Sequence, residues 1–398
     1  MDQLMTASAA TPARRLYEAL AGGDRDVLDE VLHPDFVGLL ADGMPGAVGG
    51  QHVGPAAMRR DGWGAIARDF EVRAEPEQYL MTDDGRLLVT GRYTGSGRRG
   101  GGAVDAPFAH LLTLTDGRIS RLEQYTDTAR WVTAAPPLRA LSLEVTDGVA
   151  TVRMDRPGHS NAIDDVMGRE LLEVADRLAS DRGVRVVLLG GNGAMFSAGG
   201  DIDLFSSTPA PELPGRLRSM IDDYHLAIER LTEIDAPVVA VVRGAAAGGG
   251  LGLVCAADFV VAAEDAVFTL GYSGIGLTAD GGNSWYLPRL VGMRRAQEMF
   301  LLNRRLTAAE ALEWGLVSRV VPADAAEQEG AEMAARLASG PTRAFGGVRR
   351  LLRQSLETGL RDQLAAERAS IVETSATADA REGIAAFSER RRPHFTGQ

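Results

Sequence analysis

The chain has 398 residues, more than one ordinary domain holds, so two domains are expected. Hydrophobic residues make up 45% and charged residues 24%, as in globular proteins with a buried core, and the net charge of −12 argues against nucleic acid or an anionic membrane as the main partner. All 42 basic residues other than histidine are arginines. Cys255 is the single cysteine, which excludes an intrachain disulfide. Without a signal-peptide pattern or an apolar run of bilayer length, we expect a cytoplasmic protein.

The hydrophobic pattern of the first 132 residues predicts helices followed by strands. Apolar periodicity predicts helices at 12–21, 24–32 and 55–70. Alternating patterns predict strands at 70–75, 79–82, 86–93, 108–115 and 119–125. This is the order of an α+β domain. Thr-Ala-Ala-Pro-Pro at 133–137 is typical of a linker.

The region after the linker predicts an α/β domain. A hairpin is expected at 141–146 and 149–154. Helices then alternate with buried strands, the helices at 164–179 and 213–234 and the strands at 184–190, 238–243 and 259–262. From residue 284 onward nearly all of the chain is expected to be helical.

Two glycine-rich stretches each follow a predicted buried strand. Residues 196–201 read Phe-Ser-Ala-Gly-Gly-Asp, and residues 244–252 read Gly-Ala-Ala-Ala-Gly-Gly-Gly-Leu-Gly. Glycine allows a backbone to approach a ligand closely, and a helix N-terminus after such a turn favours negative charge. Either stretch alone is a weak signal, because one glycine-rich turn is usually only a tight turn. The two in this order indicate a site for an anionic group.

Together with other motifs, these stretches resemble the crotonase (enoyl-CoA hydratase/isomerase) superfamily over residues 138–397. The further matching segments are 154–162, 276–282, 287–292, 308–317 and 381–387. The resemblance implies repeated ββα turns followed by C-terminal helices that form a homotrimer or hexamer. It also implies an acyl-CoA substrate, with coenzyme A entering as part of the substrate and no permanently bound cofactor.

The resemblance also assigns site residues. The backbone N–H groups of Gly200 and Gly249 match the two donors of an oxyanion hole, which stabilises a thioester enolate as charge moves onto oxygen. Ala198 falls in the substrate-binding turn. The first CoA-binding turn carries Arg156, His159 and Asn161, and Arg391 is a further candidate for a phosphate contact in a neighbouring subunit.

Both glutamates of the family's hydratases are absent from their matching positions. Gly252 and Tyr272 stand there, so addition of water has no paired acid and base. A carboxylate remains at Asp280, where isomerase branches of the family use an acid to move a proton between carbons of the acyl chain. An isomerase is therefore favoured over a hydratase. The alternative for Asp280 is a helix cap or turn residue.

A hydrolytic function is an alternative hypothesis, and it depends on His225. Together with Asp280 it resembles the 4-chlorobenzoyl-CoA dehalogenase branch, in which the aspartate attacks an aromatic ring and the histidine activates water. Tyr224 and Tyr272 are candidate aromatic walls for such a ring. That branch has an aromatic residue at the position of Gly200, so the dehalogenase hypothesis ranks second to the isomerase. The third hypothesis is a non-catalytic crotonase scaffold with a ligand-binding first domain. No metal-ligand cluster and no dinucleotide-binding turn is found in the sequence.

The first region resembles the nuclear-transport-factor-2-like cone, in its SnoaL-like form, over residues 10–132. The resemblance rests on His-Pro-Asp-Phe at 33–36 and on 121–127. Its expected pocket residues are Tyr17, Asp35, Asp105, His110, Gln124 and Asp127. His110 and Gln124 are expected to satisfy each other there, with Trp63 and Trp131 in packing roles. Because 37–40 lack the carboxylate that ketosteroid isomerases use, a substrate-holding or assembly role is favoured for this domain.

Overall fold

A computed structural model describes residues 2–46 and 48–398 of the chain. By internal contacts the chain divides into two compact units, Met1–Pro137 and Leu138–Gln398. None of the helices in the described ranges is both long and apolar enough to cross a membrane.

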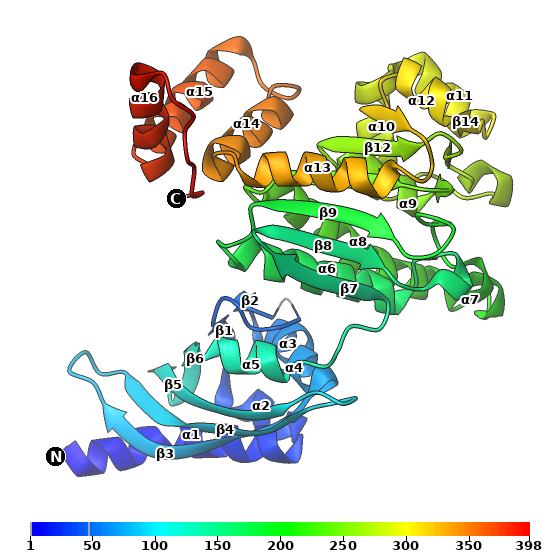
Figure 1. Cartoon of the computed structure of the whole chain (residues 1–398). Helices are drawn as coiled ribbons and strands as arrows, with labels where there is room; N and C mark the ends of the chain where they lie inside the picture. Colours follow the sequence, from blue (N-terminus) through cyan, green and yellow to red (C-terminus); the bar gives the residue numbers. More distant parts are fainter. Residues whose placement is uncertain (1, 47) are drawn as a thin grey trace. The chain divides into compact units, whose positions relative to one another are not determined.

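The first unit is one curved sheet of six strands with helices packed on it (Figure 1). Its strand order is β2-β1-β6-β5-β4-β3. The elements in chain order are α1 (Asp2–Gly22), α2 (Arg25–Val31), β1 (Leu32–Leu40), β2 (Gly50–Val53), α3 (Pro55–Ala57), a π-helical turn (Met58–Trp63), α4 (Gly64–Asp69), β3 (Phe70–Met81), β4 (Leu87–Gly97), β5 (Ala103–Thr115), β6 (Arg118–Thr126) and α5 (Thr128–Ala134).

Alternating burial along the strands produces the core of this unit. Along β4 the side chains alternate between buried and half-buried, as expected for a sheet with one face covered. Helix α1 packs against β3, β4 and β6 and adds Leu16 and Tyr17 to the core. Trp131 of α5 is buried against Phe70 and Tyr93, so its predicted packing role is confirmed.

The structure departs from the sequence prediction at three places in this unit. No strand was predicted at 33–36, but these residues lie in β1, where the pairing with β6 shifts register between Leu32 and Val37. Pro34 has no N–H to donate, which is compatible with a strand only at such an irregularity. The strands predicted at 70–75 and 79–82 are one strand, β3, bulged between Pro76 and Gln78. Strand β2 was not predicted.

The second unit is built on a six-stranded sheet of order β15-β12-β10-β9-β8-β7 and a three-stranded sheet of order β11-β13-β14. Its elements are β7 (Leu141–Thr146), β8 (Val149–Met154), a 3₁₀ turn (Pro157–His159), α6 (Asp165–Ser180), β9 (Val186–Gly191), α7 (Ile202–Ser207), α8 (Leu213–Glu233), β10 (Val238–Val242), β11 (Ala245–Ala247), α9 (Gly249–Ala256), β12 (Phe259–Ala263), β13 (Val267–Thr269), a second 3₁₀ turn (Tyr272–Ile275), α10 (Asn283–Val291), α11 (Met293–Leu301), β14 (Leu306–Thr307), α12 (Ala308–Glu313), β15 (Arg319–Val321), α13 (Ala326–Ala338), α14 (Thr342–Gln354), α15 (Leu360–Ser375) and α16 (Ala378–Glu389).

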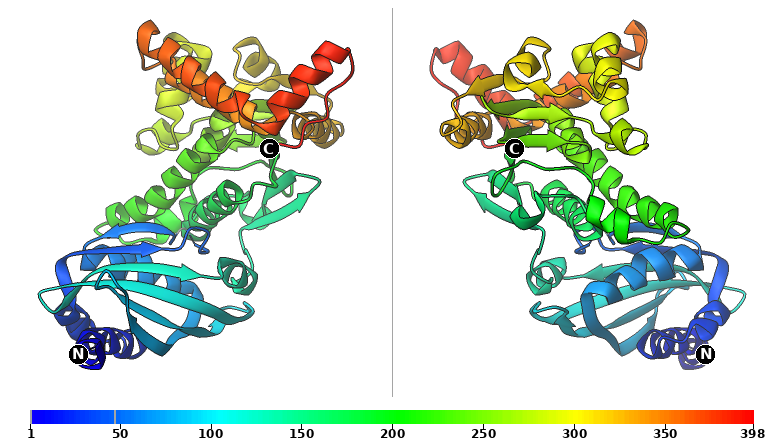
Figure 2. Two further views of the ribbon diagram at one scale, coloured as in Figure 1. Left: turned by 90° about the vertical axis from the view of Figure 1, so that its left-hand side faces the viewer. Right: turned by 90° about the vertical axis from the view of Figure 1, so that its right-hand side faces the viewer.

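The parallel strands of this unit place the two glycine-rich turns together. Strands β9 and β10 are neighbours and run parallel, so the segments that follow them leave the sheet at the same edge. Both strands are buried on both faces almost throughout, which explains their continuous apolar sequences. Helices α14 to α16, orange to red in Figure 2, lie at one end of this unit. The short strands β14 and β15 interrupt the stretch that was expected to be helical.

Candidate active site

The two glycine-rich turns are in direct contact. Ser197 and Ala246 form a parallel bridge, and the Ala247 N–H donates to the Ser197 carbonyl at 2.9 Å. Gly199 has φ +86°, and a Cβ there would lie 2.7 Å from the Ala247 carbonyl oxygen. Only glycine permits this conformation and this approach. The contact places Gly200 and Gly249 just beyond it, one on each turn.

Gly200 and Gly249 each present an unused backbone donor. Across residues 2–46 and 48–398, neither N–H donates to a protein acceptor. Gly249 is the first residue of α9, where helical N–H groups have no partner and the helix dipole is positive. Two such donors side by side can stabilise a developing oxyanion.

Asn283 holds the peptide group that carries the Gly249 N–H. Its Nδ2 donates to the Gly248 carbonyl and to the Asp280 carbonyl, both at 2.9 Å, and its side chain is fully buried. Because a peptide group is planar, fixing the Gly248 carbonyl also fixes the direction of the Gly249 N–H. The sequence interpretation missed Asn283. Its one signal was a polar residue, after two glycines, directly before the apolar periodicity of the next helix.

His225 and Asp280 form a close pair beside these donors. His225 Nε2 lies 2.6 Å from Asp280 Oδ1, and the side chains are 46% and 23% exposed. The hydrogen bond to Asp280 raises the pKa of His225 above its usual value, against the opposing effect of burial. The following residue, Gly281, lies against Gly249, since a Cβ on Gly281 would be 3.5 Å from the Gly249 Cα. The structure therefore brings these predicted site residues together.

A raised histidine pKa makes a testable contribution to stability. The folded state holds the His225 proton more tightly than the unfolded state, so the contribution is full below the ordinary histidine pKa and is lost as pH rises through the folded value. We expect wild type to lose more Tm than His225→Gln between pH 6 and pH 9. The difference should be at most about 2–4 °C, because the pair is partly exposed. Equal losses in calorimetric scans of both proteins would contradict this pairing.

A cavity of about 630 Å³ opens beside His225. It lies among α8, α10 and α14, and its walls include Trp285, Tyr286 and Arg353. The two aromatic rings meet edge to face at a centroid distance of 4.7 Å. His225 thus borders a space large enough for a small acyl or aryl group.

The positions that match the hydratase glutamates are occupied by other structure. A Cβ on Gly252 would lie 2.2 Å from the Gly281 carbonyl oxygen, so no side chain fits there. Tyr272 is half-buried, and its hydroxyl donates to the Asp280 carbonyl at 3.3 Å. Burial raises the pKa of Tyr272, which keeps it protonated at neutral pH. Neither position supplies a carboxylate.

Replacing Gly252 by alanine is expected to lower the free energy of unfolding by about 1–3 kcal/mol, because the added methyl group collides with backbone. The matched control is Gly215→Ala on α8, where a Cβ would meet nothing within 4 Å. The control should be neutral or slightly stabilising, since alanine is the better helix former. Denaturant titration of both variants checks the prediction, and equal stabilities would show that the site tolerates a side chain at Gly252.

Tyr224 was expected to form a substrate wall, and this is corrected. It is 2% exposed, and its hydroxyl donates to the Gly249 carbonyl. Its ring leaves little room for a side chain at either glycine, because a Cβ on Gly249 would lie 3.6 Å from Tyr224 Cε1 and a Cβ on Gly281 would lie 3.0 Å from it. Tyr224 therefore supports the glycine-rich turn at 244–252 and does not line a substrate pocket. Ala198 is exposed at the surface of its turn.

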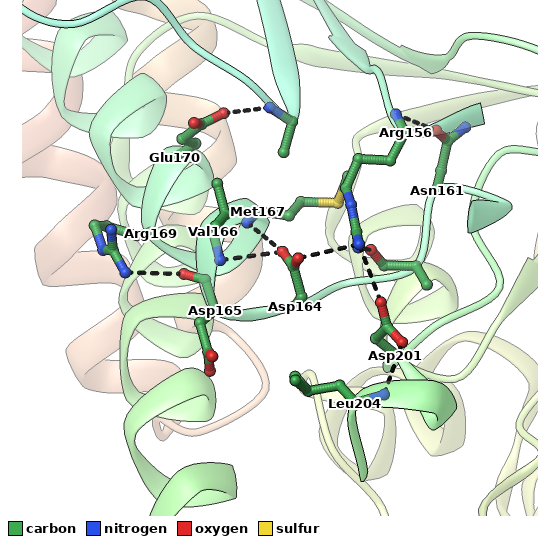
Figure 3. A network of polar contacts seen from close by, with 12 residues as sticks. Arg156, Asn161, Asp164, Asp165, Val166, Met167, Arg169, Glu170, Asp201 and Leu204 are labelled. Carbon is green, nitrogen blue, oxygen red and sulfur yellow. Dashed lines mark hydrogen bonds and ion pairs between the residues drawn. The ribbon is translucent and has the colours of Figure 1, made fainter. Parts of the chain in front are cut away.

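The turn expected to bind coenzyme A also differs from the sequence prediction. Figure 3 shows the Arg156 guanidinium between Asp164 and Asp201, each at 3.1 Å. Asn161 is fully buried, with its side chain bonded to the backbone of Arg156 and to the carbonyls of residues 192 and 195. Both side chains brace the turn, because left-handed backbone at Asn161 requires local support. His159 is exposed and open to a ligand.

Several other predicted residues are engaged elsewhere. The Arg391 guanidinium binds Glu382 at 2.6 Å, so a phosphate would have to compete with that carboxylate. In the first unit, Asp35 has a 93% exposed side chain, and Asp127 caps the N-terminus of α5. Asp105 is an exposed partner of Arg92. These three aspartates do not line the cavity enclosed by the first unit. Its walls do include Tyr17, His110 and Gln124. His110 and Gln124 were expected to satisfy each other, but they are joined through Tyr93.

Comparison with known families decides the identity of the second unit. Residues 144–398 match the family model described as enoyl-CoA hydratase/isomerase. The chain belongs to this family. Residues 13–122 match a SnoaL-like domain, so both family resemblances seen in the sequence are confirmed. Within the described residues, no group of three or more His, Cys, Asp or Glu side chains could hold a metal ion.

Relatives in the family carry out different reactions. The chain is 41% identical over 214 residues to 4-chlorobenzoyl coenzyme A dehalogenase-1 of an Arthrobacter species, covering 54% of this chain and 78% of the relative. It is 34% identical over 254 residues to 1,2-epoxyphenylacetyl-CoA isomerase of Escherichia coli K12, covering 64% and 97%. A solved enoyl-CoA hydratase from Polaromonas sp. JS666 superposes with a TM-score of 0.62 at 32% identity, covering 65% and 100%. Family membership alone therefore leaves the reaction type open.

Proposed function

We propose that this protein is an acyl-CoA isomerase that moves a double bond or rearranges a ring through a thioester enolate. The observation that carries the proposal is the His225–Asp280 pair beside the unused Gly249 donor, at a site whose two hydratase positions hold no carboxylate. The coenzyme A portion of the substrate is the only cofactor chemistry required. Of the candidate contacts for coenzyme A, the exposed His159 is the best placed.

In the proposed reaction, backbone N–H groups stabilise the developing negative charge and one carboxylate transfers the proton. The Gly200 and Gly249 N–H groups hold the thioester oxygen, and one such donor is typically worth about 2.7–4 kcal/mol in the transition state. Asp280 takes a proton from the carbon next to the thioester, and the C–H electron pair moves into the enolate. The same carboxyl then returns the proton further along the chain. His225 orients the carboxylate through its hydrogen bond to Oδ1. One basic group suffices, because no water is added.

Incubation with a 3-enoyl-CoA tests this function. We expect the absorbance of a conjugated thioester to grow as 2-enoyl-CoA forms. If neither this substrate nor an aryl-acetyl-CoA epoxide is consumed, the isomerase proposal fails. Acyl-CoA turnover that depends on Asp280 would also rule out a purely non-catalytic scaffold.

A second candidate is a hydrolytic dehalogenase. Two observations favour it, the 2.6 Å His225–Asp280 contact and the relative named 4-chlorobenzoyl coenzyme A dehalogenase-1. Asp280 would attack the halogen-bearing ring carbon and expel halide, and His225 would activate water to cleave the aryl ester. His225→Ala separates the candidates. The dehalogenase should stall with an aryl group on Asp280, visible by intact mass with 4-chlorobenzoyl-CoA, whereas the isomerase should keep most of its turnover.

The C-terminal helices support a proposed homotrimer, or a hexamer made of two trimers. Helices α14 to α16 expose many large apolar side chains, among them Leu352, Leu360, Ile371, Ile384 and Phe387. Phe387 is 87% exposed, and such a surface is typical of a subunit interface. We expect the double variant Ile384→Asp/Phe387→Asp to be monomeric in light scattering, and Val53→Asp to keep the wild-type mass. A wild type that is monomeric at micromolar concentration would contradict the assembly.

A further inference from the structure

Three acceptors surround the Arg156 guanidinium. Its Nη1 donates to the Ala162 carbonyl, and its Nη2 lies 3.1 Å from one oxygen each of Asp164 and Asp201 (Figure 3). The arginine side chain is 16% exposed, so these contacts are largely shielded from water. A planar fork of donors meets a carbonyl and two carboxylates in fixed directions at once, which the single ammonium group of a lysine does not.

The two aspartates do not need the arginine for their other structural role. One oxygen of Asp164 accepts from two N–H groups in the first turn of α6 and caps that helix. One oxygen of Asp201 caps α7 in the same way. In each carboxylate, Arg156 contacts the other oxygen. Helix capping therefore does not explain why the guanidinium also binds the Ala162 carbonyl.

The Ala162 carbonyl belongs to the first of two peptide groups that lead to the Gly200 N–H. In that group, the Ile163 N–H donates to the Gly199 carbonyl at 2.7 Å. The Gly199 carbonyl in turn shares its peptide group with the Gly200 N–H. Because a peptide group is planar, holding its carbonyl sets the direction of its N–H. The guanidinium, the two peptide groups and the proposed oxyanion donor thus form one continuous chain.

A second set of contacts holds the residue that follows the donor. The Asp201 N–H donates to the Ile163 carbonyl at 3.0 Å, and Ile163 and Gly200 form a parallel bridge. Arg156 binds the side chain of the same aspartate, so it acts on the donor from both sides. Hydrogen bonds in a chain polarise one another, so a cation at the first donor also strengthens the last N–H.

We propose that Arg156 is a positioning residue for the reaction, which orients and polarises the Gly200 N–H through the two peptide groups. This role rests on the proposed function, in which Gly200 and Gly249 hold the thioester oxygen. Each donor then has one supporting side chain, since Asn283 holds the peptide group of the Gly249 N–H. The role replaces the contact with coenzyme A that the sequence predicted for Arg156, because its guanidinium is engaged within the protein.

The test uses the full-length chain and a ligand that reports on the donors without turnover. Cinnamoyl-CoA is a conjugated thioester whose chain has no hydrogen that an isomerase could move, and two aligned N–H groups shift its absorbance to longer wavelength. Arg156→Met keeps the apolar stem and has no donor, whereas Arg156→Lys keeps one charged donor. The matched control is Arg153→Met, because Arg153 is 20% exposed and binds Glu327 of α13 at 2.8 Å.

We expect the absorbance shift in Arg156→Met to fall to about half that of wild type or less. Its kcat for a 3-enoyl-CoA should be about 10- to 100-fold lower, with KM within about threefold, because a small misplacement of one donor weakens transition-state stabilisation. Arg156→Lys should lie between wild type and Arg156→Met in both readouts. Arg153→Met should match wild type in both, even where its melting temperature is lower.

The outcomes separate this role from the function on which it rests. If neither cinnamoyl-CoA nor but-2-enoyl-CoA shifts when it saturates wild type, the oxyanion site itself fails, and the role of Arg156 fails with it. If wild type shows the shift and Arg156→Met shows it undiminished, only the role of Arg156 is overturned. Arg156→Lys takes the place of Arg156→Met in this comparison if circular dichroism shows that the methionine variant is unfolded. An equal loss in Arg153→Met would also overturn the role, because the loss of any ion pair would then have the same effect.

Discussion

Asp280→Asn is expected to lower kcat for isomerisation of a 3-enoyl-CoA by about 10²- to 10⁴-fold, the usual contribution of a positioned acid–base group. Asparagine keeps the size of the side chain and can still contact His225, but it cannot accept a carbon-bound proton. KM should change little, because the proposed oxyanion donors Gly200 and Gly249 and the proposed CoA contact His159 are untouched. Initial rates from the conjugated-thioester absorbance provide the measurement.

The matched control for that variant is Asp222→Asn. Asp222 is an exposed carboxylate on α8 whose charge also acts on His225. Its replacement removes one negative charge near the site without touching the proposed acid–base group, so kcat should stay within about twofold. If Asp222→Asn is as damaging as Asp280→Asn, the effect is one of local charge, and Asp280 has no special role in the reaction.

Asn283→Ala is expected to lower kcat by about 10- to 100-fold, with a smaller effect on KM. The variant loses the hydrogen bonds that tie the Gly248–Gly249 peptide to the Asp280 carbonyl, at 2.9 Å each. A small misplacement of the Gly249 N–H, the proposed oxyanion donor, is enough for a loss of this size. Asn283 is fully buried, so we propose that it acts as a positioning residue.

A spectroscopic readout separates positioning from a general loss of stability. Two aligned N–H groups polarise a bound conjugated thioester, which shifts its absorbance to longer wavelength. We expect this shift to shrink in Asn283→Ala and to persist in Asn192→Ala, whose side chain donates to Asp155. An unchanged shift together with a reduced melting temperature would make Asn283 a purely structural residue.

Much of the second unit could be predicted, because its motifs report directly on backbone geometry. The glycines at 199 and 248 adopt positive φ, and the strands before them are buried on both faces, so the sequence carried both signals. The pairing of His225 with Asp280 was different. The two residues are 55 positions apart, and only the packing of α8 against the loop before α10 brings them within 2.6 Å.

The site predictions that differ from the structure also have physical explanations. Arg156 and Asn161 were interpreted as ligand contacts from their motif, but nothing in a motif reveals that Asp164 and Asp201 lie close enough to bind Arg156 first. In the first unit, polarity alone could not separate His110, whose side chain faces inward, from Asp35, whose side chain faces solvent. Asp35 lies in the irregular stretch of β1 between Leu32 and Val37, which advances five positions while the paired residues of β6 advance two, so strand alternation does not predict the face on which its side chain lies.

The most direct test of the central claim is the fate of the α-hydrogens of the substrate. A 3-enoyl-CoA carrying two deuterons at C2 would be incubated with wild type and with Asp280→Asn, and the acyl group followed by NMR. Formation of an enolate predicts that wild type removes one deuteron from C2, which then appears at C4 or is replaced by solvent hydrogen, while the variant leaves C2 intact. Turnover with both deuterons still at C2, or a covalent acyl or aryl adduct on Asp280 in its place, would contradict the account.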